Sequence, residues 1–402
     1  MSVQHRTQAQ TRIPYRALST AALAATIAAL GVAGNASADT YKVTNTKDHG
    51  DGSLRKAIHQ SDQAKGRDAI RFKQGLTGEV PVRKQQDITD PVRILGNGNS
   101  DLVLTGTLSG SKLQFVTNKR TRSRLAGLTL QRVSIEARGQ GGDRGGLQVF
   151  DSHLDGDNSS GRSGIYAYKA PLTVGEVEVT GFLNDGIAVS RAPSEITDST
   201  VDGNGGTGAV ASGGDMVIEG TTLSDNRHYG AVSQYNGFVG LTNSTISGNG
   251  DPTRVDSGGI NGYGGSFKIE ASTITDSFFA PAAGLQKGGA AMSGSQGGTI
   301  TIADSIIAGN HGRNCSPDAS FLSEGGNVWQ EANGCDGIKG TDVIGDPLLG
   351  PLANNGGPTK THAIGAGSPA IGNAGPDAPD VDQRGIERDG APDSGAYELT
   401  GG

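Results

Sequence analysis

The sequence predicts an all-β protein built as a parallel β-helix, and three observations support this. Segments 200–204, 222–226 and 245–249 share one template: a small hydroxyl residue, an aliphatic residue, a polar residue, a turn residue and asparagine. A second marker, a glycine that opens a short alternating segment, runs in phase with it at Gly164, Gly186, Gly208 and Gly230. Both markers recur every 22 or 23 residues, which leaves room for short strands and turns but for no helix. We therefore expect successive turns of chain to stack, with equivalent side chains in rows.

Composition excludes the main alternatives. Glycine occupies 66 of 402 positions without recurring at every third residue, so the chain is not collagen-like. Aromatic residues make up 4% and hydrophobic residues 34%, too little for the thick core of a doubly wound α/β enzyme. A β-propeller needs about 40 residues per blade, nearly twice the observed period. The 41 acidic residues outnumber the 34 basic ones, so no nucleic-acid partner is expected.

Residues 1–38 have the pattern of a signal peptide. Basic residues at Arg6, Arg12 and Arg16 precede an apolar run over 17–33, and small residues follow at 36–38. We expect cleavage before Asp39 and a secreted, periplasmic or cell-surface location; a retained membrane anchor is the alternative. No transmembrane segment is expected in the mature chain, because no later apolar run is long enough.

The remaining chain divides into three parts. Residues 39–68 are expected to form an N-terminal cap that covers the open end of the coil, with Ser53 capping a helix whose Leu54, Ala57 and Ile58 share one face. Residues 69–345 are expected to form the β-helix. Residues 346–402 lack the repeat and are rich in proline and glycine, so we expect an irregular C-terminal cap packed over the last turns. We expect a monomer.

Two further structural predictions come from single residue types. Cys315 and Cys335 are the only cysteines, and in an oxidising compartment they are expected to form a disulfide. The asparagines of the template are expected to form a ladder in which stacked amides satisfy one another: Asn204, Asn226 and Asn249, with Asn310 in a later copy.

The ends of the chain resemble a known family. The opening motifs are VTNT at 43–46 and GDGSLRKAI at 50–58. The closing motifs are DPLLGPLANNGGPT at 346–359, TH at 361–362, GSPAI at 367–371, DQRG at 382–385 and GAYE at 395–398. With the repeat between them, they resemble exported bacterial β-helix proteins with a choice-of-anchor Q-type C-terminal domain. The resemblance implies a right-handed, pectin-lyase-like β-helix in a family whose members mostly lack an assigned activity.

The repeat also assigns directions to the side chains. After each opening glycine, the first and third residues are small or aliphatic and are expected to point inward, so the second and fourth point outward. The outward set is rich in rings and amides, with Lys169 and Arg191 just beyond it. Rings stack on sugars and cations pair with uronate carboxylates, so this face is expected to bind a glycan, unless it is ordinary solvated surface. The candidate glycan-binding residues are Tyr166, Tyr168, Gln234, Tyr235, Asn261 and Tyr263.

Two pairs of residues are candidate catalytic groups. Lys169 and Arg191, on adjacent turns, could serve a polysaccharide lyase as base and as the group that neutralises the uronate. Asp155 and Glu178, roughly 8 Å apart by strand spacing, could serve an inverting glycoside hydrolase, with His153 beside them. Solvated charged surface is the competing interpretation for both.

No metal or cofactor is expected. The predicted glycan face carries no acidic cluster, which disfavours a calcium-dependent lyase. The late acidic residues from Asp377 to Asp393 lack calcium-loop spacing, and Asp382 is expected to pair with Arg384 in a turn. A structural or catalytic calcium ion is the alternative. The sequence therefore favours a non-catalytic exported protein that contacts polysaccharide, with a lyase or hydrolase acting on an acidic glycan as the alternative.

Overall fold

The structure is a computed structural model. It describes residues 38–64, 66–98, 100–107, 110–117, 122–139, 145–254, 256–279, 289–316 and 318–400. The predicted signal peptide lies outside the described residues, apart from Ala38.

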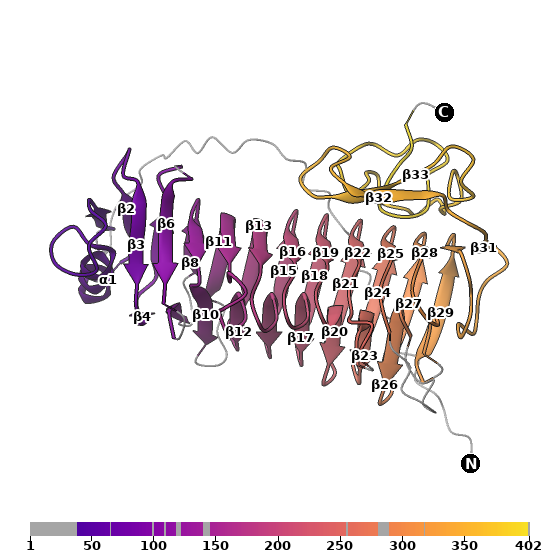
Figure 1. The fold of residues 1–402 in the computed structure, drawn as a ribbon, viewed down its shortest axis with the longest axis horizontal. Coiled ribbons are helices and arrows are strands. Elements are labelled where there is room, and N and C mark those ends of the chain that lie inside the picture. The colour runs from indigo at the N-terminus through magenta and orange to yellow at the C-terminus, as the bar shows by residue number, and fades with distance from the viewer. Residues whose placement is uncertain are drawn as a thin grey trace, which may run out of the picture. The chain divides into compact units, whose positions relative to one another are not determined.

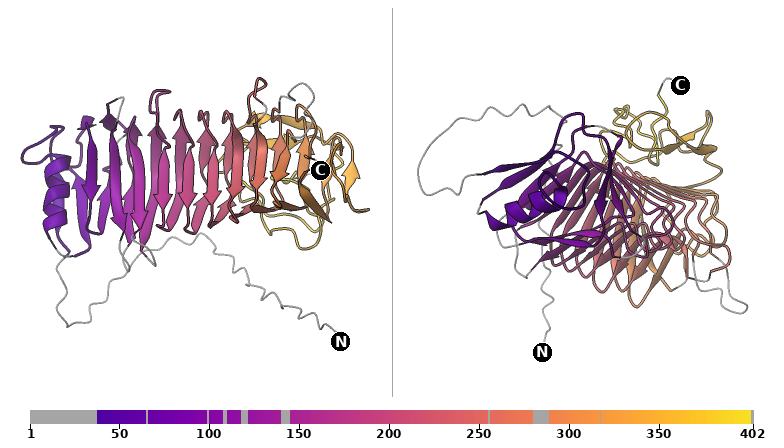
Figure 2. Two further views of the ribbon diagram at one scale, coloured as in Figure 1. Left: turned by 90° about the horizontal axis from the view of Figure 1, so that it is seen from below. Right: turned by 60° about the vertical axis from the view of Figure 1, so that its left-hand side comes forward.

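The fold is a right-handed parallel β-helix, as the repeat and the resemblance predicted (Figure 1). Each turn contributes short strands to three columns, and strands of successive turns pair in parallel (Figure 2). Two columns merge where the long strands β11 (Gly146–Asp155) and β13 (Leu172–Thr180) run through both. The third sheet is separate and has nine strands.

The first column contains β1 (Thr40–Val43), β2 (Asp68–Phe72), β5 (Val92–Leu95), β8 (Arg122–Ala126), β15 (Ser194–Thr197), β18 (Asp215–Glu219), β21 (Phe238–Thr242), β24 (Ser266–Glu270), β27 (Thr299–Ala303) and β29 (Ser320–Gly325). The second column contains β3 (Gly78–Val82), β6 (Leu102–Gly106), β9 (Thr129–Gln131), β16 (Thr200–Asp202), β19 (Thr222–Ser224), β22 (Thr245–Ser247), β25 (Thr273–Thr275), β28 (Ile306–Ala308), β30 (Val328–Trp329) and β31 (Val343–Ile344). The nine-stranded sheet contains β4 (Gln85–Ile88), β7 (Lys112–Thr117), β10 (Ser134–Gly139), β12 (Ile165–Tyr168), β14 (Ile187–Ser190), β17 (Ala209–Ser212), β20 (Tyr229–Gln234), β23 (Gly258–Tyr263) and β26 (Met292–Ser295).

The repeated aliphatic position forms a row through the core. Val201, Leu223 and Ile246 are aligned across β16, β19 and β22, and none of the three is exposed to solvent. Each strand is short, so the core is only a few side chains wide, and every turn supplies the same inward positions. This is how a chain with so few large apolar residues still buries a continuous core.

The predicted asparagine ladder is present over three turns. Asn204 Nδ2 donates to Asn226 Oδ1 at 3.0 Å, and Asn226 Nδ2 donates to Asn249 Oδ1 at 3.1 Å. Asn310 does not continue it directly, because Ser277 occupies the intervening turn and donates its backbone N–H to Asn310 Oδ1 at 3.0 Å. The amides satisfy both one another and the backbone, so the tight turn needs no water.

A second polar ladder was not predicted. Buried hydroxyl side chains precede the second-column strands, and each accepts a hydrogen bond from the backbone of the turn before it. Thr221 Oγ1 accepts from Ser199 N at 3.3 Å, and Ser244 Oγ accepts from Thr221 N at 3.2 Å. Ser272 and Ser305 extend the series. The ladder satisfies backbone groups at a corner that the strand pairing leaves open.

The opening glycines are required by close approach. A Cβ atom at Gly186 would lie 2.2 Å from Val201 Cγ1 and 3.0 Å from Asn204 Nδ2. Both neighbours are buried, one in the aliphatic row and one in the asparagine ladder. Glycine is therefore the residue that lets the chain turn tightly around the ladder into the nine-stranded sheet.

The N-terminal end is closed by the helix α1 (Leu54–Gln63), as predicted (Figure 1). Ser53 is its N-cap and accepts from Lys56 N, and Leu54, Ala57 and Ile58 are buried. The strand ladder starts earlier than expected, because β1 pairs with β2 within the segment assigned to the cap.

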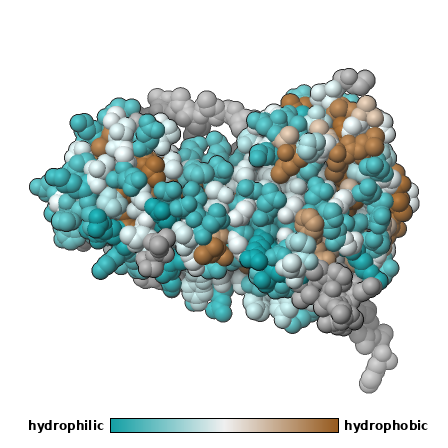
Figure 3. Space-filling view, viewed as in Figure 1, coloured by the Kyte–Doolittle hydropathy of each residue, from teal (hydrophilic) through white to brown (hydrophobic). Residues whose placement is uncertain are grey.

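Residues 346–400, here called the C-terminal lobe, are largely irregular. Their strands β32 (Leu349–Ala353) and β33 (Thr361–Ile364) form an antiparallel pair. Asp382 and Arg384 form the expected ion pair at 2.6 Å, and Arg388 forms a second, buried pair with Glu398 at 3.2 Å. Hydrophobic residues gather on the surface of the lobe (Figure 3), where Leu348, Ile371, Val381 and Ile386 are exposed.

The lobe docks along the side of the coil rather than over its open end. Gln383 Nε2 donates to Thr222 Oγ1 at 3.0 Å, and Thr245 Oγ1 donates to Gln383 Oε1 at 2.6 Å. Further along, Gly375 N donates to Asp304 Oδ1 at 2.7 Å. These contacts follow the second column from β19 to β28, so one lobe spans several turns (Figure 1).

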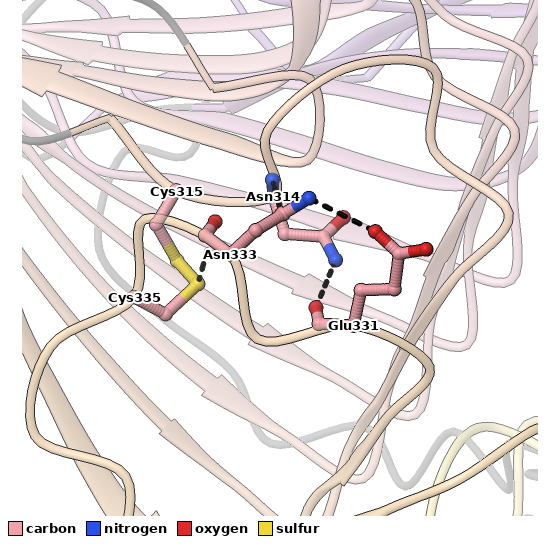
Figure 4. The surroundings of a disulfide bond; sticks show 5 residues. All are labelled: Asn314, Cys315, Glu331, Asn333 and Cys335. Atoms are coloured by element: carbon pink, nitrogen blue, oxygen red, sulfur yellow. Dashed lines mark hydrogen bonds between the residues drawn. A yellow bond between two sulfur atoms is a disulfide. The ribbon is translucent and has the colours of Figure 1, made fainter.

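The segment that carries the disulfide packs against the core in the last turns of the coil. Cys315 and Cys335 are linked, as predicted, with Cα atoms 4.9 Å apart. Figure 4 shows the bond beside Asn314 and Asn333, where Asn314 N donates to Asn333 Oδ1 at 2.9 Å. Trp329, fully buried, packs edge-on against Phe321 in the last turn. The disulfide thus links two segments that both pack against the core.

Candidate functional site

The candidate glycan-binding residues lie on the outer surface of the nine-stranded sheet, here called the open face. On β12, Ile165 and Ala167 are fully buried while Tyr166 and Tyr168 are partly exposed, as the alternation predicted. Strands β10, β12 and β14 are in register, so Glu136, Tyr166 and Ala188 form one outward row. Parallel stacking therefore turns a spacing of about 22 residues into neighbouring side chains.

Two cations flank one ring on the open face. Lys169 Nζ lies 5.2 Å from the centre of the Tyr168 ring, and Arg191 Cζ lies 5.9 Å from it. Lys169 and Arg191 have φ values of 53° and 57°, so both sit in left-handed turns at the rim of the sheet. Within the described parts of the chain, neither side chain forms a salt bridge. Both cations are therefore available to an anionic ligand.

An aromatic pair lies three turns further along. The Tyr235 and Tyr263 rings are 6.2 Å apart and nearly perpendicular. Tyr235 is 63% exposed and also occupies a left-handed turn, and Gln296 Nε2 donates to the Tyr263 hydroxyl. Gln234 precedes Tyr235 on the outward side of β20. These groups form a neutral surface of rings and amides, in contrast to the charged surroundings of Tyr168.

Between the two lies a small apolar strip. Ala188, Val210 and Val232 follow Tyr166 in the same outward row, and they pack with Tyr229. Burial raises the pKa of the Tyr229 phenol, while hydrogen bonds with Ser293 and Asn261 oppose the rise. Asn261 therefore has a hydrogen-bonding neighbour, as do Tyr168, whose hydroxyl accepts from Arg191, and Tyr263.

A cleft of about 490 Å³ opens at the N-terminal part of the open face. Its lining residues are Thr107, Gly110, Ser111, Lys112, Arg132, Ser134, Ile135, Glu136, Arg138, Ser160, Gly161, Arg162, Ser163, Tyr166 and Asn184. Four of them are cationic and only Glu136 is acidic. In a chain with a formal net charge of -7, this is a local excess of positive charge.

The floor of the cleft is a buried ion-pair network. Lys112 and Glu136 form a salt bridge, with side chains only 6% and 5% exposed, and Arg138 Nε also donates to Glu136. Lys112 Nζ donates to Gln114 Oε1 at 2.9 Å. Glu136 is thus held between two cations, which fixes the position of both positive charges.

The sequence analysis found Tyr166 but missed the rest of this cleft. Strands β7 and β10 lack the opening glycine and the asparagine template, so no marker placed Lys112 or Glu136 in the repeat. The one available signal was the alternation in residues 134–138, where Ser134, Glu136 and Arg138 alternate with small or aliphatic residues. Arg162 lies in a turn and carries no such signal.

The second candidate pair lies on a different surface. Asp155 and Glu178 belong to β11 and β13, whose strands are in the first and second columns rather than the nine-stranded sheet. Glu178 is directly opposite His153, and its Oε2 lies 2.8 Å from His153 Nδ1. Asp155 Oδ1 accepts from Asp157 N at 2.7 Å in the following turn. The two catalytic hypotheses therefore refer to separate sites.

Two negative observations concern the described residues alone. In the ranges given above, no group of three or more His, Cys, Asp or Glu side chains is arranged to hold a metal ion. In the same part of the chain, no helix is long and apolar enough to cross a membrane.

Solved structures with a similar fold share little sequence with this chain. Pectate lyase Pel9A is 13% identical, with a TM-score of 0.40, over 91% of this chain and 97% of that one. The A-module of the Azotobacter vinelandii mannuronan C-5 epimerase AlgE4 is 15% identical, with a TM-score of 0.44, over 76% and 95%. The Dettilon tailspike protein is 11% identical, with a TM-score of 0.44, over 76% and 68%. These values concern only the coiled architecture, which the strand ladders already establish.

No curated protein matches the chain. The sequence pattern of one family does, described as the right handed beta helix region, over residues 163–338. That range begins beside the first opening glycine and ends just after the disulfide, so the part of the chain from strand β12 to the disulfide is similar to this family.

Proposed function

We propose that this protein binds polysaccharide along the open face, as an exported protein that does not cleave its ligand. One observation carries the proposal: a partly exposed ring, Tyr168, stands between two cations that no described side chain neutralises. Rings stack on sugars and cations pair with their acidic groups, so this is the part of the surface best suited to a glycan.

The length of the open face supports an extended ligand. Tyr168 and Tyr235 are separated by three turns, which corresponds to about 14 Å at the spacing of parallel strands. A chain of sugars laid across the strands can contact both, whereas a small molecule cannot. Polysaccharide is therefore favoured over a single sugar.

A non-catalytic role is supported by the state of Glu136, the carboxylate next to Tyr166 in the outward row. Glu136 is buried between Lys112 and Arg138, so it is poorly placed to take a proton from a sugar ring. Lys169 beside Arg191 favours one alternative, a lyase in which Lys169 is the base. The disulfide supports export, because such bonds persist in oxidising compartments.

The experiment is affinity electrophoresis of the mature protein in gels containing acidic or neutral polysaccharides, scored in parallel for new reducing ends. Combined Tyr168→Ala and Arg191→Ala should abolish retention and leave the melting temperature nearly unchanged. Arg93→Ala, which removes an exposed arginine from the first column, is the control and should retain binding. Parent-like retention by the double variant would contradict the proposal, and cleavage that disappears in Lys169→Ala would favour the lyase.

A further inference from the structure

The cleft at the N-terminal part of the open face contains a hydroxyl group without a hydrogen-bond partner. Ser134 is 3% exposed, and its Oγ has no partner among the described residues. Burying a hydroxyl without a hydrogen bond is unfavourable, so such groups are uncommon in folded proteins. Ser134 lies on the outward side of β10 with Glu136, opposite the buried Ile135, and it lines the cleft. An acceptor that enters the cleft beside Ser134 would complete this hydroxyl.

Donors from three other side chains surround the same space. Lys112 stands directly opposite Ser134 across the strand pair, and its Nζ uses two of its three hydrogens on Gln114 and Glu136. Arg138 uses its Nε on Glu136, and its two Nη groups have no partner within the described ranges. Arg162, on the turn before β12, also lines the cleft and forms no ion pair with any described residue. The cleft thus offers hydrogen-bond donors and positive charge. Its one lining carboxylate, that of Glu136, is already paired with Lys112 and Arg138.

We infer that this cleft is a subsite for an oxyanion substituent of the glycan, a sulfate ester or a uronate carboxylate, which Ser134, Lys112, Arg138 and Arg162 would bind together. The inference rests on the proposed function and deepens it, because it predicts which end of the bound glycan carries the charged sugar. The charged sugar would occupy the cleft beside Tyr166, and the less polar part of the chain would lie toward Tyr235 and Tyr263.

Glu136 explains why the donors stay fixed when no ligand is present. Its two carboxylate oxygens hold Lys112 and Arg138 in place. Because two cations face one carboxylate, the three side chains together keep a net positive charge. Donors held in this way lose little side-chain entropy on binding. The arrangement is selective as well, because a neutral sugar would leave the Ser134 hydroxyl and the guanidinium groups incompletely bonded.

The test compares three polymers: dextran sulfate, polygalacturonate and neutral dextran. Ser134→Ala should weaken binding of the preferred acidic polymer about ten-fold, the value of one charge-assisted hydrogen bond, and Arg162→Gln should weaken it similarly. Neither change should alter the affinity for neutral dextran. Retention of the acidic polymer should also fall at high salt, because exposed charges are screened. The polymer whose affinity the Ser134 variant loses identifies the substituent.

Two controls separate binding from folding. Ser233→Ala removes another buried hydroxyl without a partner from the same sheet, outside the cleft, and should leave binding unchanged. Ser134→Ala should melt at the parent temperature or above it, because it removes an unsatisfied polar group.

Three outcomes would overturn the inference. If the Ser134 and Arg162 variants bind both acidic polymers as the parent does, the subsite is wrong. If neither acidic polymer binds better than neutral dextran, but binding depends on Tyr168 or Tyr235, the subsite is wrong and the proposed function stands. If no polymer is retained at all, both fail.

Discussion

Two outward surfaces of the same coil carry different side chains. In the second column, the row that contains Thr222, Thr245 and Thr273 lies under the C-terminal lobe, and these threonines are at most 1% exposed. On the open face, the outward positions of β12 carry Tyr166 and Tyr168, which stay partly accessible. Short hydroxyls fit a covered surface, because they fill little space and can both donate and accept hydrogen bonds. Rings and long cations fit a surface that must reach a ligand.

The contrast also exists within the second column itself. Before the lobe begins, the same row contains the charged or polar residues His153 and Glu178 as well as Thr129 and Thr200. Under the lobe it continues as Thr222, Thr245 and Thr273, followed by Ile306, with no charged residue. The strands pair in the same way throughout, so the loss of charged residues from this row coincides with the neighbouring lobe and not with a change in the fold. In this column, the charged outward residues therefore mark the uncovered turns.

The largest expected effect comes from the core that both surfaces share. Leu223→Asp places a charge at a fully buried position of the aliphatic row, which costs several kcal/mol, and should prevent folding. Leu322→Asp makes the same change at a leucine that is 53% exposed and should fold normally. A Leu223 variant that is soluble and melts cooperatively would show that the assigned row is wrong.

The next largest effect should fall on the covered surface. Gln383→Ala removes the side chain that joins the lobe to Thr222 and Thr245, and it leaves the buried Thr245 hydroxyl without its acceptor. The expected loss is roughly 2–4 kcal/mol. Gln234→Ala on the open face should change the free energy of unfolding by less than about 0.5 kcal/mol. Equilibrium unfolding in urea and limited proteolysis of the lobe measure both. Equal stability of the two variants would contradict the distinction between the surfaces.

A smaller effect is expected at the turn that connects the two surfaces. Gly186→Ala forces a Cβ atom against Val201 and Asn204 and should cost roughly 1–3 kcal/mol through overpacking. Gly340→Ala is the matched control, since nothing lies within 4 Å of a Cβ atom there. Thermal unfolding of both variants decides the point, and a Gly186 variant as stable as the parent would mean that the turn relaxes freely.

The smallest expected effect is a pH dependence of lobe docking. Burial raises the pKa of Asp304, against the hydrogen bond that its carboxylate accepts from Gly375. A raised pKa in the folded state means that this group stabilises the protein fully below its unfolded pKa of about 4, and that the contribution is lost as pH rises through the folded value. Asp304→Asn should flatten this dependence, and asparagine tolerates the left-handed φ of 51° there.

The measurement is the urea midpoint of unfolding across pH 4 to 7. Asp215→Asn, at an exposed position of β18, should leave the pH profile unchanged. If the Asp304 variant retains the parent's profile, the pH dependence arises elsewhere.

The fold could be predicted from sequence where every turn uses the same residue types at the same positions. The aliphatic row, the asparagine ladder and the opening glycines recur because every turn must fill one core and round one corner. The hydroxyl ladder had a comparable signal, since Ser199, Thr221 and Ser244 each precede a template segment, but the position lies just outside the template. The lateral docking of the lobe had none, because it depends on single contacts such as that of Gln383.

The candidate site could be predicted only in its later turns. Tyr166 and Tyr168 follow a glycine marker, so their direction could be derived from alternation. Lys112 and Ser134 lie in turns that carry no marker, and their proximity depends on the pairing of β7 with β10, which only the structure provides. Buried ion pairs and unsatisfied hydroxyls depend on which residues of different turns lie side by side, so they cannot be derived from one segment of sequence.

The register of the nine-stranded sheet fixes the spacing between side chains along the open face. The distance between the cations at Tyr168 and the rings at Tyr235 is a whole number of turns, and parallel pairing allows no fractional value. Removing or adding one 22-residue turn would change that distance by one strand spacing, about 4.8 Å, and leave every remaining side chain on the same face. The length of ligand that fits the protein can therefore change in discrete steps, through duplication or loss of a single repeat, without any change in the chemistry at either end.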